Sequence, residues 1–356
     1  MNKLFFALSA LACMTLFNAC STDVDLYADY KDVAIIYGLL DASVDTNYVR
    51  INRAFSSSND HPINAMEVAL IEDSCNYPGK LKAYLLELQK SGNEYIPTGR
   101  DTIYLDTITI HDKDTGVFYS PNQKVYYTAE ALKENTVNKR YKYRLEIFKG
   151  NDTITSETGL VGGENFKILT SQATFMLSDN SSSGKISFKP ADNAVFYDVK
   201  MVFNYQEKHG DKLEDKQVKW DFGAQSIDWL PYEDGVYYVT YEKNSLFNLL
   251  EDAIGSDTVF DPNHPNVERY FDERAIDIMI AAGGEELYNY IRVNSVSGYS
   301  QAVPDYTNID GGYGVFSSRV NRSKSVLLST QTQFDLYSKK EWGFKDISFL
   351  KYFRKL

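Results

Sequence analysis

The sequence is poor in the residue patterns that usually mark an enzyme or a metal site. Its 356 residues include only four histidines. His61, His111, His209 and His264 are scattered, and none has the H-x-x-x-H or H-E-x-x-H spacing of a zinc site. The chain also lacks a G-x-S-x-G elbow, a P-loop and a G-x-G-x-x-G loop. We therefore expect no metal, no cofactor and no catalytic residue.

Cysteine is equally scarce, with three in the whole chain. Cys13 and Cys20 lie in the N-terminal leader, so Cys75 alone belongs to the body, and a disulfide framework would have to use Cys20. A nucleophilic thiol needs a base beside it, and His61 or His111 is the candidate. No protease-like flanking sequence accompanies Cys75, so we expect it to be a buried, inert thiol.

Long apolar runs and excess positive charge are also missing. The longest apolar stretch, residues 4–17, is shorter than the roughly 20 residues that a transmembrane helix needs. Lys and Arg number 37 against 49 Asp and Glu, which gives a formal net charge of -12. Such a chain repels a phosphate backbone, so we expect no nucleic-acid partner.

The N-terminus has the organisation of a secretory signal. Lys3 precedes the apolar stretch, which ends in Leu16-Phe17-Asn18-Ala19-Cys20 and resembles a bacterial lipobox. We predict a lipoprotein signal peptide at residues 1–19 and an acylated (palmitate-bearing) Cys20, whose acyl chains suffice for stable membrane attachment. The alternatives are a lipobox at Cys13 and a plain signal peptide with an incidental cysteine.

The segment after the cysteine, residues 20–32, reads as a tether with four acids. It is similar to the acidic stretch that follows the lipid cysteine in surface-exported lipoproteins of Bacteroidetes. That similarity implies an outer-membrane lipoprotein that faces the cell exterior. An ordinary solvated linker on a periplasmic lipoprotein is the alternative.

The body has a β pattern. Aromatic residues make up 14% of the chain, with 27 Tyr and 20 Phe, which favours strands. Hydrophobic residues at 43% and charged residues at 24% are typical of a packed globular protein. Alternation or apolar runs predict strands at 33–40 (buried on both faces), 49–55, 66–71, 81–88, 103–109, 141–147, 153–156, 186–188, 195–205, 218–222, 236–241, 276–280, 315–316 and 326–328. A helix is expected at 245–254, ended by Gly255, whereas 285–293 fits either type.

A glycine-rich segment at 159–163 suggests a domain boundary. We predict a mainly β protein with two immunoglobulin- or fibronectin-like β-sandwich domains in tandem. The N-terminal sandwich is expected at 33–163. The C-terminal sandwich is expected at 164–338, with a short helical insertion near 245–254, and a tail follows at 339–356.

An aromatic cluster is the one hint of a binding site. Trp220, Trp229 and Tyr232 lie close together in sequence, and Asp228 stands among them. Exposed rings beside carboxylates make a sugar-stacking surface, because the ring face is apolar and the acids accept hydroxyl hydrogens. The alternative is that the rings fill the sandwich core, with Trp229 and Tyr232 as the expected exceptions.

Four threonines follow an aspartate and precede an apolar residue: Thr102, Thr107, Thr153 and Thr258. This triplet is similar to the O-glycosylation acceptor of exported Bacteroidetes proteins. It implies that one or more of the four carries a glycan. The alternative is that threonine is simply common in strands.

Three parts of the chain together resemble a known family: residues 30–41 with 48–55, residues 141–147 with 156–161, and residues 308–319 around Gly311-Gly312-Tyr313-Gly314. They resemble the uncharacterised outer-membrane lipoproteins of Bacteroidetes, a domain-of-unknown-function family often encoded beside TonB-dependent nutrient transporters. The resemblance implies a location and a nutrient-uptake setting. It supplies no catalytic or ligand residues. The glycines themselves predict a tight turn or bulge with positive φ.

These observations favour a non-enzymatic, lipid-anchored accessory protein that binds a glycan, a peptide or a partner for a TonB-dependent outer-membrane transporter. A structural or adhesive surface lipoprotein is the first alternative. A surface hydrolase is the second, because the carboxylate pair of a glycosidase cannot be recognised from sequence spacing.

Overall fold

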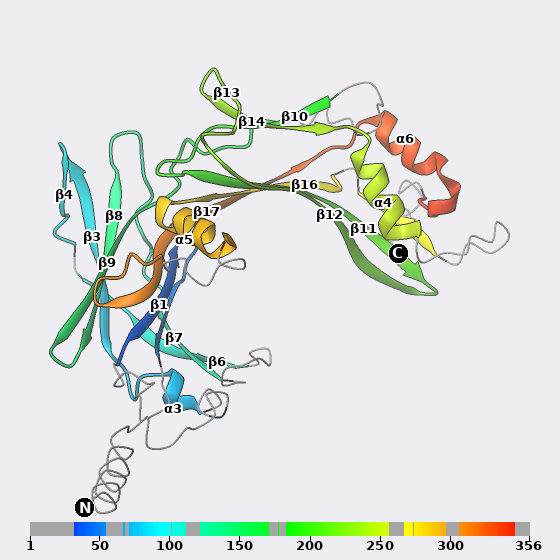
Figure 1. Cartoon of the computed structure of the whole chain (residues 1–356). Helices are drawn as coiled ribbons and strands as arrows, with labels where there is room; N and C mark the ends of the chain where they lie inside the picture. The colour runs from blue at the N-terminus through cyan, green and yellow to red at the C-terminus, as the bar shows by residue number, and fades with distance from the viewer. Residues whose placement is uncertain are drawn as a thin grey trace, which may run out of the picture.

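The computed structural model describes residues 32–54, 67, 71–100, 102–111, 122–170, 177, 183–255, 267–272, 274–296 and 306–345. Strands dominate these residues, which confirms the mainly β class. They form an arch of two arms (Figure 1). The N-terminal half of the chain builds one arm, and most of the C-terminal half builds the other (Figure 1).

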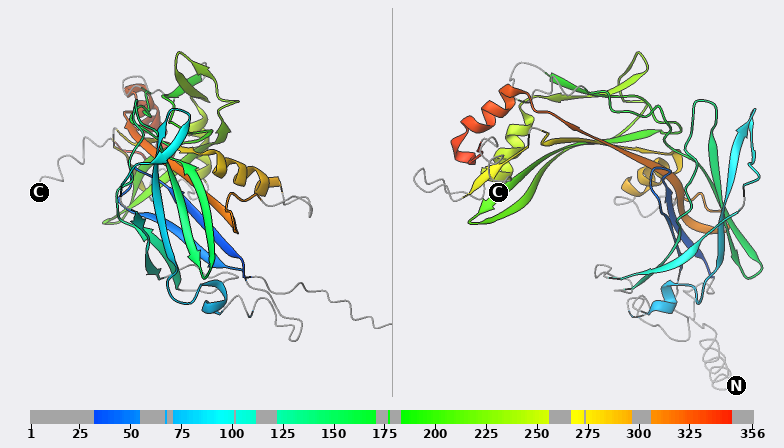
Figure 2. Two further views of the ribbon diagram at one scale, coloured as in Figure 1. Left: turned by 90° about the vertical axis from the view of Figure 1, so that its left-hand side faces the viewer. Right: turned by 180° about the vertical axis from the view of Figure 1, so that it is seen from behind.

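A single long sheet runs through both arms. In the described part of the chain its strand order is β12-β11-β16-β17-β1-β2-β7-β6, with β15 added on β11. The strands are β1 (Ala34–Leu40), β2 (Asn47–Arg53), β6 (Asp106–Ile110), β7 (Gln123–Thr128), β11 (Phe196–His209), β12 (Lys212–Ser226), β15 (Glu268–Tyr270), β16 (Ile276–Gly283) and β17 (Gly312–Val326). This sheet forms the inner side of the arch, as the views from the front and from behind agree (Figures 1 and 2).

Two smaller sheets cover the outer side of the long sheet, one on each arm (Figure 2). The first contains β3 (Lys82–Ser91), β4 (Glu94–Pro97), β5 (Ile103–Tyr104), β8 (Tyr141–Lys149) and β9 (Asp152–Gly159). The second contains β10 (Ser183–Phe188), β13 (Tyr232–Glu233) and β14 (Val236–Glu242). The helical elements are α3 (Glu72–Cys75), α4 (Ser245–Gly255), α5 (Glu285–Val296), α6 (Thr330–Ser338) and the 3-10 turn η3 (Lys340–Trp342).

Each arm has its own hydrophobic core, and one strand contributes to both. Phe316 of β17 is fully buried in the core of the first arm, beside residues of β1 such as Ile36. Val320 and Val326 of the same strand are buried in the core of the second arm. β17 pairs in parallel with β1 and antiparallel with β16. The two cores are therefore joined by the backbone of one strand.

The structure corrects several predicted elements. Residues 315–316 and 326–328 belong largely to one long strand, β17, and the ambiguous segment 285–293 is the helix α5. Of the predicted strand 66–71, the structure describes a helical Glu67 and a bend at Ile71, so the strand is wrong at both. A short apolar run fits either period, which explains this error.

Two burial expectations also change. Tyr37, in the middle of β1, is 39% exposed, so this strand is not buried on both faces as predicted. The start of the predicted tail, residues 339–345, packs onto the body, because Trp342 and Phe344 are buried in the second core. The helix at 245–254 is confirmed as α4. The boundary near 159–163 stays a prediction.

The glycines at the start of β17 allow two backbones to approach closely. Gly311 has φ +82° and Gly314 has φ +113°, so the predicted positive φ is confirmed at both. A Cβ atom on Gly314 would lie 1.9 Å from the carbonyl oxygen of Ile36 in β1. Any side chain at this position would therefore push β17 away from its parallel partner.

We predict that Gly314→Ala lowers the free energy of unfolding by several kcal/mol, because it adds a backbone collision to an unfavourable φ. The matched control is Gly150→Ala, which has φ +61° but nothing within 4 Å of its added Cβ, and should cost only about 1–2 kcal/mol. Urea unfolding of both variants measures the difference. Equal losses would show that the contact with β1 is unimportant.

A buried carboxylate ties the outer sheet of the first arm together. Glu87 of β3 has a side chain only 1% exposed. One of its carboxylate oxygens accepts hydrogen bonds from Thr98 Oγ1 at 2.8 Å and Lys133 Nζ at 2.6 Å. The other accepts from Arg100 Nη1 at 3.0 Å and Tyr143 Oη at 3.1 Å. Burial alone would raise the pKa of Glu87, but these four donors outweigh it and hold the pKa below the ordinary 4.5.

We predict that Glu87→Gln destabilises the protein by about 2–4 kcal/mol at neutral pH, since two cations lose a buried partner. The folded-state pKa is depressed, so this stabilisation is complete above about pH 4.5 and is lost as the pH falls through the folded value. The gap between wild type and variant should therefore close in acid. Glu130→Gln is the control, because Glu130 is a 55% exposed partner of Arg100 and should cost little. A pH-independent gap would contradict the assignment.

Candidate functional site

The helix α5 lies on the inner side of the arch where the two arms meet (Figures 1 and 2). Its first turn carries Glu285 and Glu286, a charge that suits a helix N-terminus. Glu286 Oε2 accepts hydrogen bonds from Thr158 Oγ1 at 3.1 Å and from Ser317 Oγ at 2.9 Å. The same Ser317 oxygen accepts from the backbone N–H of Leu287 at 3.2 Å. These bonds fix the start of α5 to β9 and β17.

Two cavities lie between α5 and the inner face of β1 and β17, and both are bordered by Tyr37 and Tyr290. The larger, here the Arg319 cavity, has about 560 Å³ and is also lined by Tyr48 and Asn321. The smaller, the Tyr306 cavity, has about 430 Å³ and extends to Tyr306, Tyr313 and Asn294. Both volumes fall within the usual range of small-ligand sites.

Tyr37 and Tyr290 form the boundary that the two cavities share. Their rings meet edge to face with centroids 6.0 Å apart and an interplanar angle of 75°. The two hydroxyl oxygens are 3.4 Å apart. This geometry is typical of a stable aromatic pair.

A third cavity, the Trp229 cavity of about 420 Å³, lies on the other side of α5. Phe196 and Tyr288 stack in its wall with centroids 5.7 Å apart, and the Arg292 guanidinium lies 5.4 Å from the Tyr288 ring centre. Trp229, in the turn after β12, completes this cavity and is 82% exposed. Aromatic cavities therefore border α5 on both sides.

The charges around α5 are few and differ in their surroundings. Arg319 is exposed and has no ion pair or hydrogen-bond partner within the described residues. Asp41, the carboxylate of the Arg319 cavity, already accepts from the N–H and hydroxyl of Ser43 at 2.8 and 2.6 Å. Burial, together with the nearby carboxylates of Glu286 and Glu285, raises the pKa of Tyr306. Tyr306 therefore remains a hydrogen-bond donor at neutral pH.

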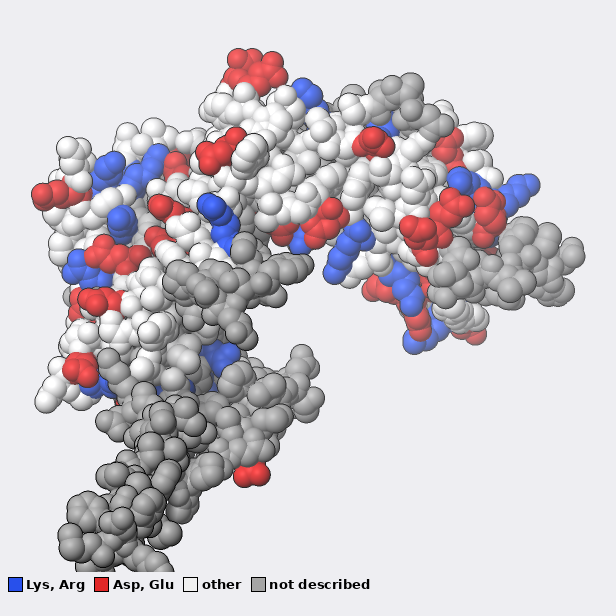
Figure 3. All heavy atoms as spheres, in the orientation of Figure 1, with Lys and Arg blue, Asp and Glu red and all other residues white. Residues whose placement is uncertain are grey.

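The inner face of the second arm is polar. Lys200 of β11 lies 3.1 Å from a carboxylate oxygen of both Asp198 and Asp221, so its charge is compensated. The space-filling view shows acidic and basic groups interspersed over both arms rather than gathered by sign (Figure 3).

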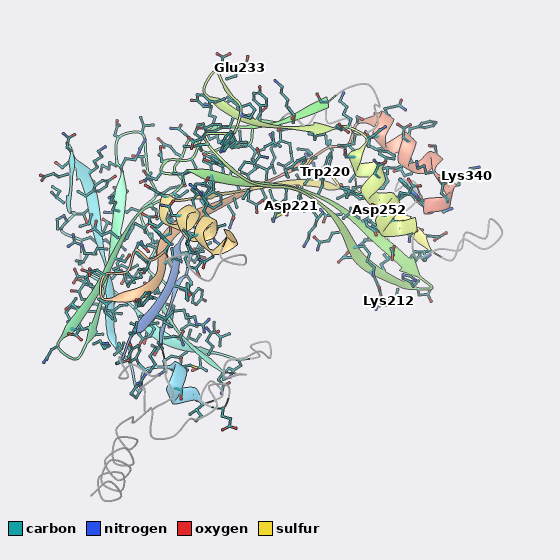
Figure 4. The ribbon with its side chains drawn as sticks, viewed as in Figure 1. Lys212, Trp220, Asp221, Glu233, Asp252 and Lys340 are labelled. Atoms are coloured by element: carbon teal, nitrogen blue, oxygen red, sulfur yellow. The ribbon has the colours of Figure 1, made fainter. Side chains whose placement is uncertain are left out.

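The structure does not bring the three sequence-predicted ligand residues together. Only Trp229 lines a cavity beside α5. Trp220 packs against the second core, with its ring edge-on to Tyr241 at 5.6 Å. Tyr232 is 58% exposed in β13. Its neighbour in β13, Glu233, lies on the outer side of the arch, apart from Trp220 (Figure 4). A ligand-binding role for these residues stays a prediction.

The other predicted positions are distributed as follows. Thr102 and Thr107 are half-buried, Thr153 is exposed at the start of β9, and Cys20 and Thr258 lie outside the described residues. O-glycosylation and lipidation therefore stay predictions. Cys75 is buried, as expected of an inert thiol.

The histidines and acidic clusters give no metal site in the described part of the chain. His111 Nδ1 lies 2.8 Å from Asn122 Oδ1, and His209 Nε2 lies 3.5 Å from Glu207. His61 and His264 lie outside the described residues. Across the described ranges, no group of three His, Cys, Asp or Glu residues is placed to hold a metal ion.

Sequence reasoning missed the tyrosines of the inner face. Tyr37, Tyr48 and Tyr313 lie at solvent-facing positions of β1, β2 and β17, and sequence neighbours such as Ile36 and Val49 are buried. The alternation of these strands already contains this signal. The sequence did not show that β1 and β2, near the start of the body, and β17, near its end, place their exposed rings in the same cavities as Tyr290 of α5.

Comparisons with known proteins give no identification. No protein-family model matches the chain. No curated protein is significantly similar to it in sequence. Among the described helices, none combines the length and the hydropathy that a membrane span requires.

We predict that Trp229 dominates collisional quenching of the intrinsic fluorescence. The chain has three tryptophans; Trp229 is 82% exposed, Trp342 is 3% exposed and Trp220 is half-buried. Trp229→Phe should therefore remove most of the quenching by iodide, and Trp220→Phe, the control, should remove little. Unchanged quenching in Trp229→Phe would mean that this side chain is covered in solution.

Proposed function

We propose that this protein is a lipid-anchored binding protein of the cell surface that holds a nutrient for a TonB-dependent outer-membrane transporter. The observation that carries the binding part is the group of three aromatic cavities around α5, on the inner side of the arch. Concave sites lined by aromatic rings and a few polar groups are the usual form of a ligand-binding site.

The cellular setting rests on the sequence. The lipobox-like end of the leader at Cys20 supports an acyl anchor, and the acidic tether at 20–32 supports a position on the outer surface. The resemblance to Bacteroidetes outer-membrane lipoproteins supports the link to a TonB-dependent transporter. In this proposal the anchor holds the arch at the membrane, and the cavities at its bend receive the ligand.

The finer fold assignment, two immunoglobulin- or fibronectin-like sandwiches in tandem, belongs to the same proposal. One contact supports it in the first arm. The hydroxyl of Tyr143 in β8 accepts a hydrogen bond at 2.9 Å from the backbone N–H of Lys133, upstream in the chain. A tyrosine hydroxyl bonded to an upstream backbone group is found at the tyrosine corner of such domains.

A structural or adhesive surface protein is the second candidate, and the edge strand β6 favours it. Among the described residues, β6 pairs with β7 alone and ends the long sheet, and its Ile108 and Ile110 are 44% and 43% exposed. Exposed apolar edge strands are sites where another chain can pair. A surface hydrolase would need two or three converging acids, whereas Asp41 is the one carboxylate lining the three cavities within the described residues.

We predict that the intact lipoprotein, isolated from native outer membrane in mild detergent, co-purifies with a TonB-dependent channel identified by mass spectrometry. Cys20→Ser is the control: it should lose the acyl mass and leave the membrane fraction, because a single amino-acid change removes the site of attachment. The same preparation thus tests anchor and partner separately.

Two results would contradict the proposal. Isolation of the protein alone, or with matrix or fibre components, would contradict the association with a transporter and favour the structural or adhesive function. Retention of Cys20→Ser in the membrane without an acyl mass would contradict the lipid anchor.

A further inference from the structure

We infer that the Arg319 and Tyr306 cavities together bind an acidic oligosaccharide, with pyranose rings stacked on the tyrosines and a uronate carboxylate on Arg319. This inference rests on the proposed binding function and names its ligand. It concerns residues on the inner face of β1, β2 and β17 and on α5, away from Trp220 and Tyr232.

The tyrosines supply stacking surfaces of the right kind. Tyr37, Tyr48 and Tyr313 are 39%, 47% and 54% exposed, although each belongs to a strand of the long sheet. Exposed rings on an otherwise packed sheet offer flat apolar faces to the C–H groups of a sugar ring. Their hydroxyls and the side-chain amide of Asn321 provide hydrogen-bond partners for sugar hydroxyls at the margin of the same cavities.

The two cavities are contiguous, because both are bordered by Tyr37 and Tyr290. Their volumes of about 560 and 430 Å³ each fall in the range of a small-ligand site. A ligand that fills both must extend past the tyrosine pair. This arrangement fits a chain of several sugar rings better than a single monosaccharide.

The backbone beneath these cavities is not available to a peptide. β1 pairs with β2 along one edge and with β17 along the other, with Tyr37 opposite both Arg50 and Val315. An extended peptide gains most of its affinity by adding a strand to a free sheet edge. The cavities instead present side chains from a sheet face, which suits a ligand recognised through its rings and hydroxyls.

Arg319 indicates that the ligand carries a negative charge. The chain has a net charge of -12, and other arginines of the long sheet have acidic partners: Arg322, on the same strand, pairs with Glu134 at 2.8 Å, and Arg269 of β15 pairs with Glu207 at 2.7 Å. Arg319 is exposed in the wall of its cavity and has no such partner among the described residues. A guanidinium binds a carboxylate through two parallel hydrogen bonds. A uronate is a sugar unit that supplies this group on a pyranose ring.

The test uses the full lipoprotein in detergent and titration calorimetry. The probes are tetramers of galacturonate, glucuronate, mannuronate and guluronate, each paired with its methyl ester, which keeps the rings and removes the charge. We expect at least one acidic probe to bind, and its ester to bind about 10- to 100-fold more weakly, as for loss of a charge-assisted contact. Arg319→Gln should remove this preference without abolishing ester binding, and Tyr290→Ala should weaken both forms.

Two controls match these variants. Arg322→Gln changes an arginine three residues along β17 that is paired with Glu134, and Tyr104→Ala removes a tyrosine that is 59% exposed in β5. Both should leave binding unchanged, and circular dichroism confirms that all four variants are folded.

Equal binding of acid and ester, an unaffected preference in Arg319→Gln, or no binding by any acidic probe would overturn the inference. Binding of extended hexapeptides or of sulfated tetramers in place of uronates would overturn it as well. These failures differ from failure of the proposed function, because co-purification with a transporter is independent of the probes. If the protein isolates with a channel but binds no uronate, the proposed function stands and the inference about its ligand is wrong.

Discussion

The parallel pairing of β17 with β1 is the constraint on which the rest of the structure depends. It joins Ala34–Leu40 near the start of the body to Gly312–Val326 near its end, while the other edge of β17 pairs with β16. Parallel neighbours need a long crossover, and here nearly the whole chain forms it. Because Phe316 enters one core and Val320 the other, displacing β17 as a whole would disturb both cores. The absence of a side chain at Gly314 makes this approach possible.

The position of the cavities follows from that pairing. Both cores and both small sheets occupy the outer side of the long sheet, so its inner side is left for side chains that need not be buried (Figure 2). The helix α5 connects β16 to β17, and its first turn is fixed by Glu286 to Thr158 and Ser317. Rings from strands at opposite ends of the sequence thereby meet rings of one helix.

The buried charge of the outer sheet and the exposed charge of the inner face have different roles. Glu87 is inaccessible and receives four hydrogen bonds, so its carboxylate stabilises the sheet and has no capacity left for a ligand. Arg319 has the opposite character, since it is exposed on the inner face and unpaired among the described residues. In an acidic protein, an unpaired cation beside aromatic rings favours the binding of an anionic ligand at this site.

The sequence by itself determined the mainly β class, most strand positions, the helix α4 and the positive φ at Gly311 and Gly314. These features depend on local alternation, capping and backbone freedom, which neighbouring residues control. It did not reveal that β17 is one long strand joining two cores, that residues 285–293 form a helix, or that Tyr37, Tyr48 and Tyr313 share a surface with Tyr290. Strand order and the packing of distant residues decide these features, because they depend on long-range pairing rather than on local pattern.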